Sequence, residues 1–326
     1  MNSKLRKLYE NPVAYCLDSK LGFLRSIGDH YYNKQTKRYA AIGAANSERK
    51  VTVIMTAYNT GDLVADAVRS VLAQSHSNLD LMIIDDASSD DTLSILKEMA
   101  SSDERIKLFH SPVNHGTYWS KNWCLANAAG EFVAFHDSDD ISAPQRLQMQ
   151  LGAMLDGAGA DAVTCRWNRV TPNGDEITID GSTSRTAIIS TMIRREKVVK
   201  EAGFFDTVRI AADTEYHMRI AKILGRRRTR NLRHVLYTGL LRDQSLTRGP
   251  EGGFNWKEDG NAITRSLSGN RAEYGAAFKK WHAEAQSLYV GFPQSKRPFE
   301  VPLSLLEACD DIDMAQVEHI SSGGVH

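Results

Sequence analysis

Short apolar, β-branched runs alternate with helix-periodic segments through the first half of this 326-residue chain. The pattern predicts four strands, at residues 51–56, 79–84, 106–109 and 131–135, with a helix after each of the first three. Alternation of this kind is typical of βαβ units, in which the strands are parallel and a helix connects them. We therefore expect an α/β fold with a Rossmann-like, mostly parallel sheet flanked by helices.

Polar residues stand where three of these strands end. Thr56, Tyr58 and Asn59 follow the first strand, Asp86 follows the second, and residues 137–140 follow the fourth. The carboxyl ends of parallel strands meet at one edge of a sheet, where ligands of such folds bind. No glycine-rich dinucleotide loop or P-loop follows the first strand, so phosphate would have to be held in another way. The sequence thus predicts one polar site at this edge.

Three carboxylates crowd the end of the fourth strand, at Asp137, Asp139 and Asp140. Carboxylate oxygens are hard ligands that suit Mg²⁺ or Mn²⁺. The alternative is a solvated acidic turn that caps the helix after Pro144. The pattern alone leaves both interpretations open.

Composition narrows the class of protein. Lys and Arg number 40 and so do Asp and Glu, so net charge gives no indication of a nucleic-acid partner. The 42% of hydrophobic residues suffice for a packed core. Residues 1–25 lack a continuous apolar core, and no stretch is long and apolar enough to span a bilayer, so we expect neither a signal peptide nor a membrane helix. The cysteines are widely spaced and indicate reduced thiols in a cytoplasmic protein; they are Cys16, Cys124, Cys165 and Cys309.

The chain is expected to have three parts. Residues 1–47 predict an N-terminal helical extension, 48–248 the main domain, and 249–326 a mostly helical C-terminal extension. The first fifty residues hold ten Lys or Arg against four acids, which leaves two options for the extension. It packs on the main domain, or it forms an amphipathic helix in peripheral contact with the inner face of a membrane. Residues 40–46 are interpreted as a linker, and residues 173–174, Asn-Gly, predict a hairpin turn.

The ordered motifs resemble the family 2 inverting glycosyltransferases of GT-A fold. The resemblance is carried by residues 51–59, 83–92, 114–116, 121–122, 130–140, 203–206 and 212–215, which occur in the family's order. It spans residues 48–248, and the opening half is particularly similar to the spore-coat polysaccharide transferases of that family. The resemblance implies transfer of a sugar from a nucleotide-diphosphate donor, a UDP-sugar in most relatives, to a hydroxyl of a glycan or lipid-linked acceptor. Because a processive-synthase motif is absent from the sequence, we expect single or limited sugar addition.

Carried over residue by residue, the resemblance implies a role for each motif position. Asp213 matches the catalytic base, and Asp139 matches the ligand of Mn²⁺ or Mg²⁺. Asp137 would lie near the ribose and Asp86 would bond the base, while Arg242 falls near a histidine of many relatives and would offset diphosphate charge. The donor-binding residues implied are Thr56, Tyr58, Asn59, Asp86, Asn114, Lys121, Asp137 and Arg242. A divalent ion offsets charge on the departing phosphate, and a single base opposite it gives inversion.

Several positions allow a second interpretation. Lys121 could lie on a solvated helix face, and Asp213 could be a helix N-cap. An alanine, Ala212, replaces the acid that usually precedes the base. With the missing late histidine, it motivates an alternative function, a weakly active or non-catalytic sugar-nucleotide-binding module of a larger glycan-assembly complex. A nucleotidyltransferase is disfavoured, because a glycine-rich basic loop does not follow the first strand. Three tryptophans could form an acceptor platform, although helical spacing favours the core for Trp119, Trp123 and Trp167.

Overall fold

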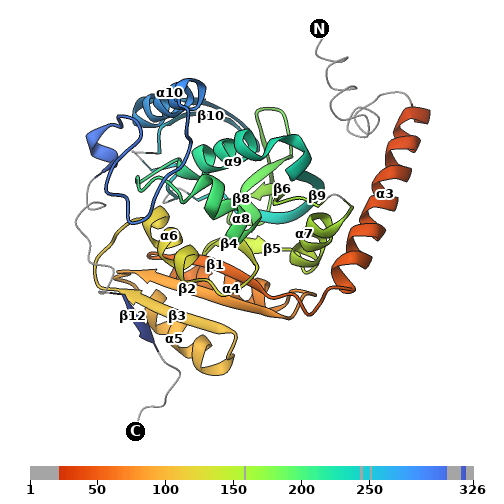
Figure 1. Cartoon of the computed structure of the whole chain (residues 1–326), viewed down its shortest axis with the longest axis horizontal. Helices are drawn as coiled ribbons and strands as arrows, with labels where there is room; N and C mark the ends of the chain where they lie inside the picture. The colour runs from red at the N-terminus through yellow and green to blue at the C-terminus, as the bar shows by residue number, and fades with distance from the viewer. Residues whose placement is uncertain (1–21, 158, 243–244, 250–251, 307–316, 321–326) are drawn as a thin grey trace.

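A 12-stranded sheet runs through the computed structural model of the chain (Figure 1). The structure describes residues 22–157, 159–242, 245–249, 252–306 and 317–320. The strands are β1 (Val51–Ala57), β2 (Leu79–Asp86), β3 (Ile106–Ser111), β4 (Phe132–Asp137), β5 (Ile141–Ser142), β6 (Ala162–Val170), β7 (Glu176–Ile179), β8 (Ser184–Arg194), β9 (Thr229–Leu240), β10 (Phe254–Asp259), β11 (Ala262–Leu267) and β12 (Glu318–Ile320). The helices are α3 (Gly22–Ala44), α4 (Gly61–Leu72), α5 (Thr92–Ser102), α6 (Thr117–Asn127), α7 (Arg146–Leu155), α8 (Arg195–Ala202), α9 (Ala212–Arg228) and α10 (Gly269–Glu284), with a 3₁₀ turn at Leu303–Leu305.

The half of the sheet that contains β1 to β4 is parallel, as expected. Its order is β4-β1-β2-β3, and each neighbouring pair is parallel. The register sets Thr56 beside Asp137 on one side and Ile84 on the other, so the three strand ends lie at one edge. The α/β class is therefore confirmed. Beyond β4 the sheet becomes mixed, because β8 is antiparallel to both β4 and β6.

The expected hairpin turn at Asn173–Gly174 is confirmed, because β6 and β7 pair as antiparallel strands on either side of it. Gly174 has a φ of 87°, a left-handed conformation that costs glycine little. The turn lets the chain reverse directly after β6. Local turn chemistry was therefore a sufficient guide here.

Helix α3 packs along α7 through two glycines (Figure 1). A Cβ on Gly43 would lie 2.1 Å from the carbonyl oxygen of Gln148, and one on Gly152 would lie 1.9 Å from that of Tyr39. Only glycine allows the backbones to approach this closely. The linker predicted at 40–46 is thus wrong for its first five residues, since an alanine-rich stretch favours helix and α3 continues to Ala44. The extension packs on the main domain over residues 30–44, whereas residues 1–21, with Cys16, lie outside the described residues.

Substitution of Gly152 by alanine should destabilise the protein by about 1–3 kcal/mol, the usual cost of overpacking. The new methyl group would collide with the backbone of Tyr39 and push α3 away from α7. Thermal melting and protease sensitivity of α3 would measure the effect. A matched control is Gly275→Ala in α10, where a Cβ meets no heavy atom within 4 Å and should stabilise by up to about 1 kcal/mol. Equal melting temperatures for both variants would contradict the close approach.

The described C-terminal region begins with a hairpin, which corrects the expectation of a mostly helical extension. β10 and β11 are antiparallel, and β11 pairs with β7, so residues 254–267 extend the main sheet. Within the described part of residues 249–326, the α-helix is confined to α10. Near the end of the chain, β12 pairs with the edge of β3. The domain boundaries at 47/48 and 248/249 stay predictions.

A buried ionic cluster fastens α10 to α9. Glu215 is fully buried and its carboxylate accepts two bonds of 2.8 Å from Arg219. The Nε2 atom of His282 in α10 lies 2.8 Å from the same carboxylate. Each buried charge is stabilised by its partners, and removal of one partner would leave another charge buried and unpaired. The cluster therefore joins α9 to α10.

Two expectations about compartment remain predictions. Cys124 and Cys165 are buried free thiols, and Cys309 lies outside the described residues. Among the helices that the structure describes, none combines the length and the apolar character needed to cross a bilayer. A cytoplasmic location and peripheral membrane contact through the basic N-terminal region are not tested by these features.

Candidate active site

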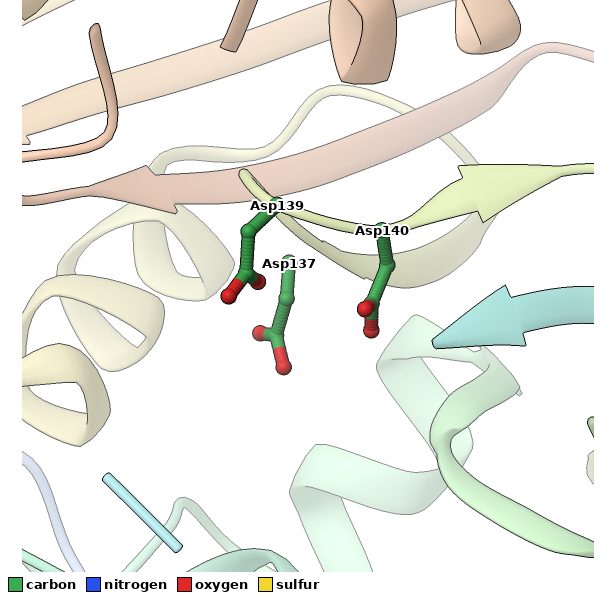
Figure 2. Close-up of side chains that lie close together, drawn as sticks. All are labelled: Asp137, Asp139 and Asp140. Atoms are coloured by element: carbon green, nitrogen blue, oxygen red, sulfur yellow. The ribbon is translucent and has the colours of Figure 1, made fainter. Parts of the chain in front are cut away.

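Three carboxylates project together from the turn after β4 (Figure 2). Asp137 ends the strand, and Asp139 and Asp140 lie in the turn that leads to β5. One oxygen of each lies within 4.8 Å of the others. Oxygens this close form a donor set of the kind that hard divalent cations prefer.

Hydrogen bonds from α7 and β9 hold the turn in place. The buried Arg146 side chain donates to the Phe135 carbonyl oxygen at 2.6 Å, and the Asp137 amide donates to the Tyr237 hydroxyl at 3.0 Å. Asp140 is 4% exposed and accepts the Leu240 amide at 3.0 Å. Its burial, and then the charges of Asp139 and Asp137, raise its pKa well above the usual range. Asp140 therefore ties the turn to β9, while the other two carboxylates face the site.

Each of those two carboxylates has a basic partner. The Nζ atom of Lys121 lies 2.9 Å from Asp137, and the Nε atom of Arg242 lies 3.0 Å from Asp139. Lys121 is only 3% exposed, so the solvated-face interpretation of this residue is wrong. The structure thus brings Lys121 and Arg242 from α6 and the end of β9 to the acidic turn.

Asp213 lies in the first turn of α9 and faces the same region. Its Oδ1 atom accepts bonds from the Tyr118 hydroxyl at 3.1 Å and the Thr214 amide at 2.7 Å. The N-cap position belongs to Ala211, so Asp213 is not the cap. Asp213 and Lys121 line a common small pocket together with Phe135, Phe205 and His217. The carboxylate of Asp213 and the acidic turn are therefore linked through one lysine.

The β2 side of the edge is built around Asp86. This carboxylate is 2% exposed, and its oxygens accept the amides of His115 at 2.9 Å and Gly116 at 2.8 Å. Burial raises its pKa despite these bonds. Asn114 donates to the Asp86 carbonyl oxygen at 3.0 Å and also contacts Arg209. Asp86 pins residues 114–116 beside β2, and its bond to a base stays a prediction.

The residues after β1 complete this side. The hydroxyl of Thr56 lies 2.7 Å from that of Thr117, at the start of α6. Tyr58 is 50% exposed, so its ring is free to meet a planar ligand. Asn59 accepts the Ser89 amide at 2.8 Å, which joins the ends of β1 and β2. These positions border the edge as expected, and their contact with a nucleotide stays a prediction.

Backbone strain concentrates at this edge. Asn59, Ala87 and Ala211 have φ values of 50°, 63° and 69°, a region that side chains with a Cβ rarely adopt. They follow β1, follow β2 and precede α9, so all three border the strand ends or the helix of Asp213. Strained residues of this kind cluster at functional sites.

Sequence reasoning missed one close partner of Asp213 and correctly placed two tryptophans. Tyr118 precedes Lys121 by three positions on α6, a spacing that puts both on one helix face and could have indicated it. Trp119 and Trp123 are buried, as the core interpretation expects. Trp167 is half-buried and lies under Arg169.

Comparisons with known proteins agree with this geometry. A family model described as Glycosyl transferase family 2 matches residues 52–228. EpsE of Bacillus subtilis, assigned as a glycosyltransferase, is 43% identical over 107 residues, which cover 32% of this chain and 38% of EpsE. WfgD of Escherichia coli, a UDP-Glc:α-D-GlcNAc-diphosphoundecaprenol β-1,3-glucosyltransferase, is 40% identical over 105 residues, or 32% of this chain and 41% of WfgD. The chain thus spans about two-fifths of the length of these relatives.

A solved structure supports the fold. TarS of Staphylococcus aureus, crystallised with UDP-GlcNAc, has a TM-score of 0.50 and 22% identity, with 60% of each chain covered. At this identity the likeness concerns the fold alone. The GT-A architecture expected from the sequence is confirmed.

Proposed function

The chain belongs to glycosyl transferase family 2, and from this premise we propose that it is a metal-dependent, inverting glycosyltransferase. It would move a sugar from a nucleotide diphosphate, a UDP-sugar, to a hydroxyl of a glycan or lipid-linked acceptor. One observation carries the proposal: Asp213 shares a pocket with Lys121, which is bonded to Asp137 of the acidic turn. A lone carboxylate in a pocket whose lysine is bonded to an acidic, cation-binding turn fits single displacement at a sugar carbon.

The acidic turn fits a divalent cation by its donor chemistry. One carboxyl oxygen of each of its three aspartates lies within 4.8 Å of the others, a set that suits Mn²⁺ or Mg²⁺. Asp139 would be the principal ligand, with Asp137 on the donor side. When bound, the ion would act as a Lewis acid that stabilises charge on the departing nucleotide diphosphate. The side chain of Arg242 lies beside Asp139 and would contribute a second positive charge to that phosphate.

Asp213 would take the proton of the acceptor hydroxyl. As that oxygen bonds to the anomeric carbon, the bond to the diphosphate oxygen breaks and its electron pair stays with the nucleotide. The Tyr118 hydroxyl and the Thr214 amide hold Oδ1, which leaves Oδ2 of Asp213 to receive the proton. The donor is proposed to carry uridine because WfgD, 40% identical over the shared span, is named for UDP-Glc.

A panel of nucleotide sugars with Mn²⁺ should identify the donor by its effect on the melting temperature. At about 100 times its dissociation constant a ligand adds about 2.7 kcal/mol, or roughly 5–10 °C for a domain of this size. UDP-sugars should give this shift and GDP-sugars should not. The size of the shift in melting temperature then ranks the donor sugars. Omission of Mn²⁺ serves as the control. A panel in which no nucleotide sugar raises the melting temperature would contradict donor binding.

The second candidate is a sugar-nucleotide-binding module of a larger assembly. The replacement of an acid by Ala212 beside Asp213 favours it, since the first turn of α9 then holds one fewer carboxylate. Calorimetry would decide between the two: donor binding without turnover on any acceptor, including water, would support the module and exclude the transferase.

A further inference from the structure

Four arginines on β6, β8, β11 and α10 lie close to Arg265 or its ring partner Phe254, and none of them belongs to the site described above. Arg169 ends β6, Arg185 begins β8, Arg265 lies on β11, and Arg271 lies in the first turn of α10. All four are half-buried. Burial, and then the charges of Arg185, Arg169 and Arg271, lower the pKa of Arg265 to about 10. The other three guanidinium groups are therefore close enough to Arg265 to repel it.

Aromatic rings hold three of these guanidinium groups in fixed orientations. Arg265 and Arg271 each lie 4.7 Å from the ring centre of Phe254, and Arg169 lies 4.4 Å from that of Trp167. Stacking of this kind leaves the edge of a guanidinium available for bidentate bonds to phosphate or carboxylate. The rings thus orient the guanidinium groups without occupying the N–H groups at their edges.

The cluster lacks enough negative charge of its own. Asp180 pairs with Arg185 at 2.5 Å and lies 3.8 Å from Arg265. Within the described ranges no carboxylate forms an ion pair with Arg169 or Arg271, and the buried Nε atom of Arg169 has no hydrogen-bond partner. A purely structural role would explain the stacking. It would not explain why several half-buried guanidinium groups lie close to one another. An anion bound between them would offset this repulsion.

The position of the cluster assigns the anion to the acceptor. The Leu240 carbonyl accepts Arg169 at 3.1 Å, and the amide of the same residue donates to Asp140. Tyr118 is bonded to Asp213, and burial and the charge of Asp213 raise the pKa of Tyr118. The positive charge of Arg271 is near enough to Tyr118 to oppose that rise. Through Arg169 and Arg271, the cluster therefore borders the Asp213 side of the site. The nucleotide residues Thr56 and Asp86 lie at β1 and β2, on the other side of β4 in the sheet order.

We propose that Arg169, Arg185, Arg265 and Arg271 form a subsite for a phosphate or diphosphate group carried by the acceptor. The inference rests on the proposed transferase function, because it assigns the bound anion to the second substrate. A phosphate ester on a lipid head group and one on a glycan share this chemistry.

Isothermal titration without metal or donor tests the subsite directly, with inorganic pyrophosphate and farnesyl diphosphate as probes. The double variant Arg265→Gln/Arg271→Gln should weaken pyrophosphate binding by about tenfold or more, since charge-assisted bonds are lost. Arg227→Gln, at an exposed position near the end of α9, is the matched control and should change binding by less than about twofold. The variant Arg265→Lys/Arg271→Lys keeps both charges but lacks the planar guanidinium fork, and it should lose an intermediate amount of pyrophosphate affinity. This variant provides the test if the glutamine variant does not fold.

Three outcomes would overturn the proposal. They are no anion binding by the wild type, unchanged binding by the double and lysine variants, and an equal loss of UDP affinity in the presence of Mn²⁺, which would assign the arginines to the donor. Farnesyl diphosphate bound about tenfold tighter than pyrophosphate would identify a lipid head group, and equal affinity would identify a glycan phosphate. Because the titration needs neither metal nor donor, it can succeed where sugar transfer fails, and the two failures remain distinguishable.

Discussion

Replacement of Asp213 by asparagine is expected to lower the rate of sugar transfer by about 10²–10⁴-fold, the usual contribution of a general base. Asparagine keeps the shape of the side chain, and its amide oxygen can still accept the Tyr118 hydroxyl and the Thr214 amide that hold Oδ1. The substitution removes only the capacity to take a proton. Release of UDP at saturating donor and acceptor would measure the loss.

The loss should appear in turnover and not in donor affinity, because the proposed role of Asp213 is to take a proton from the acceptor. Calorimetric binding of UDP with Mn²⁺ should stay within about twofold of wild type. Asp66→Asn is the matched control, since Asp66 lies on α4 with a side chain that is 71% exposed. An Asp213→Asn enzyme with more than half of the wild-type rate would remove this residue from the mechanism.

Replacement of Asp139 by asparagine is expected to abolish Mn²⁺-dependent donor binding and to slow transfer by roughly 100-fold or more. Lewis-acid stabilisation is worth several kcal/mol, and about 1.4 kcal/mol corresponds to tenfold in rate. Mn²⁺ binding, followed by electron paramagnetic resonance without any donor, gives a readout that does not depend on activity. Chelation of the wild type with EDTA should reproduce the loss, and Mn²⁺ should restore it.

Arg242 supplies a contrasting variant for the same experiment. Its Nε atom lies 3.0 Å from Asp139, so a cation that binds this carboxylate competes with the guanidinium. Arg242→Gln should therefore raise Mn²⁺ affinity by up to about fivefold, the equivalent of a weak ion pair, while it weakens UDP binding. If Asp139→Asn bound Mn²⁺ as tightly as wild type, or if Arg242→Gln lowered Mn²⁺ affinity, the metal would have to lie elsewhere.

The strand ends could be predicted because their signals are local. The alternation between β-branched and helix-periodic segments lies within short windows, and parallel connection then brings Thr56, Asp86 and Asp137 to one edge. The Asn-Gly turn after β6 is a two-residue signal of the same kind. Where one window contains the information, the sequence is a sufficient guide.

The arginine subsite could not be predicted, because it depends on distant pairing. Arg169 and Arg265 approach one another only because β11 pairs with β7, which in turn pairs with β6. No short segment carries this information. The hairpin of β10 and β11 lies in the segment for which the sequence predicts a mostly helical extension, and the charged residues Lys257, Glu258 and Asp259 weaken its strand signal. Pairing with β7 overrides that weak local preference.

The contact between His282 of α10 and Glu215 of α9 limits which chimeras of this chain and its relatives can fold. The family match ends at residue 228, yet Glu215 within that span depends on His282 beyond it. A chimera that joined residues 52–228 to another relative's C-terminal region would keep the buried Glu215–Arg219 pair and lose the third member. The same helix carries Asp213, so the defect would reach the proposed base. Modular recombination at the family boundary would therefore succeed only where the incoming segment brings its own histidine to α9.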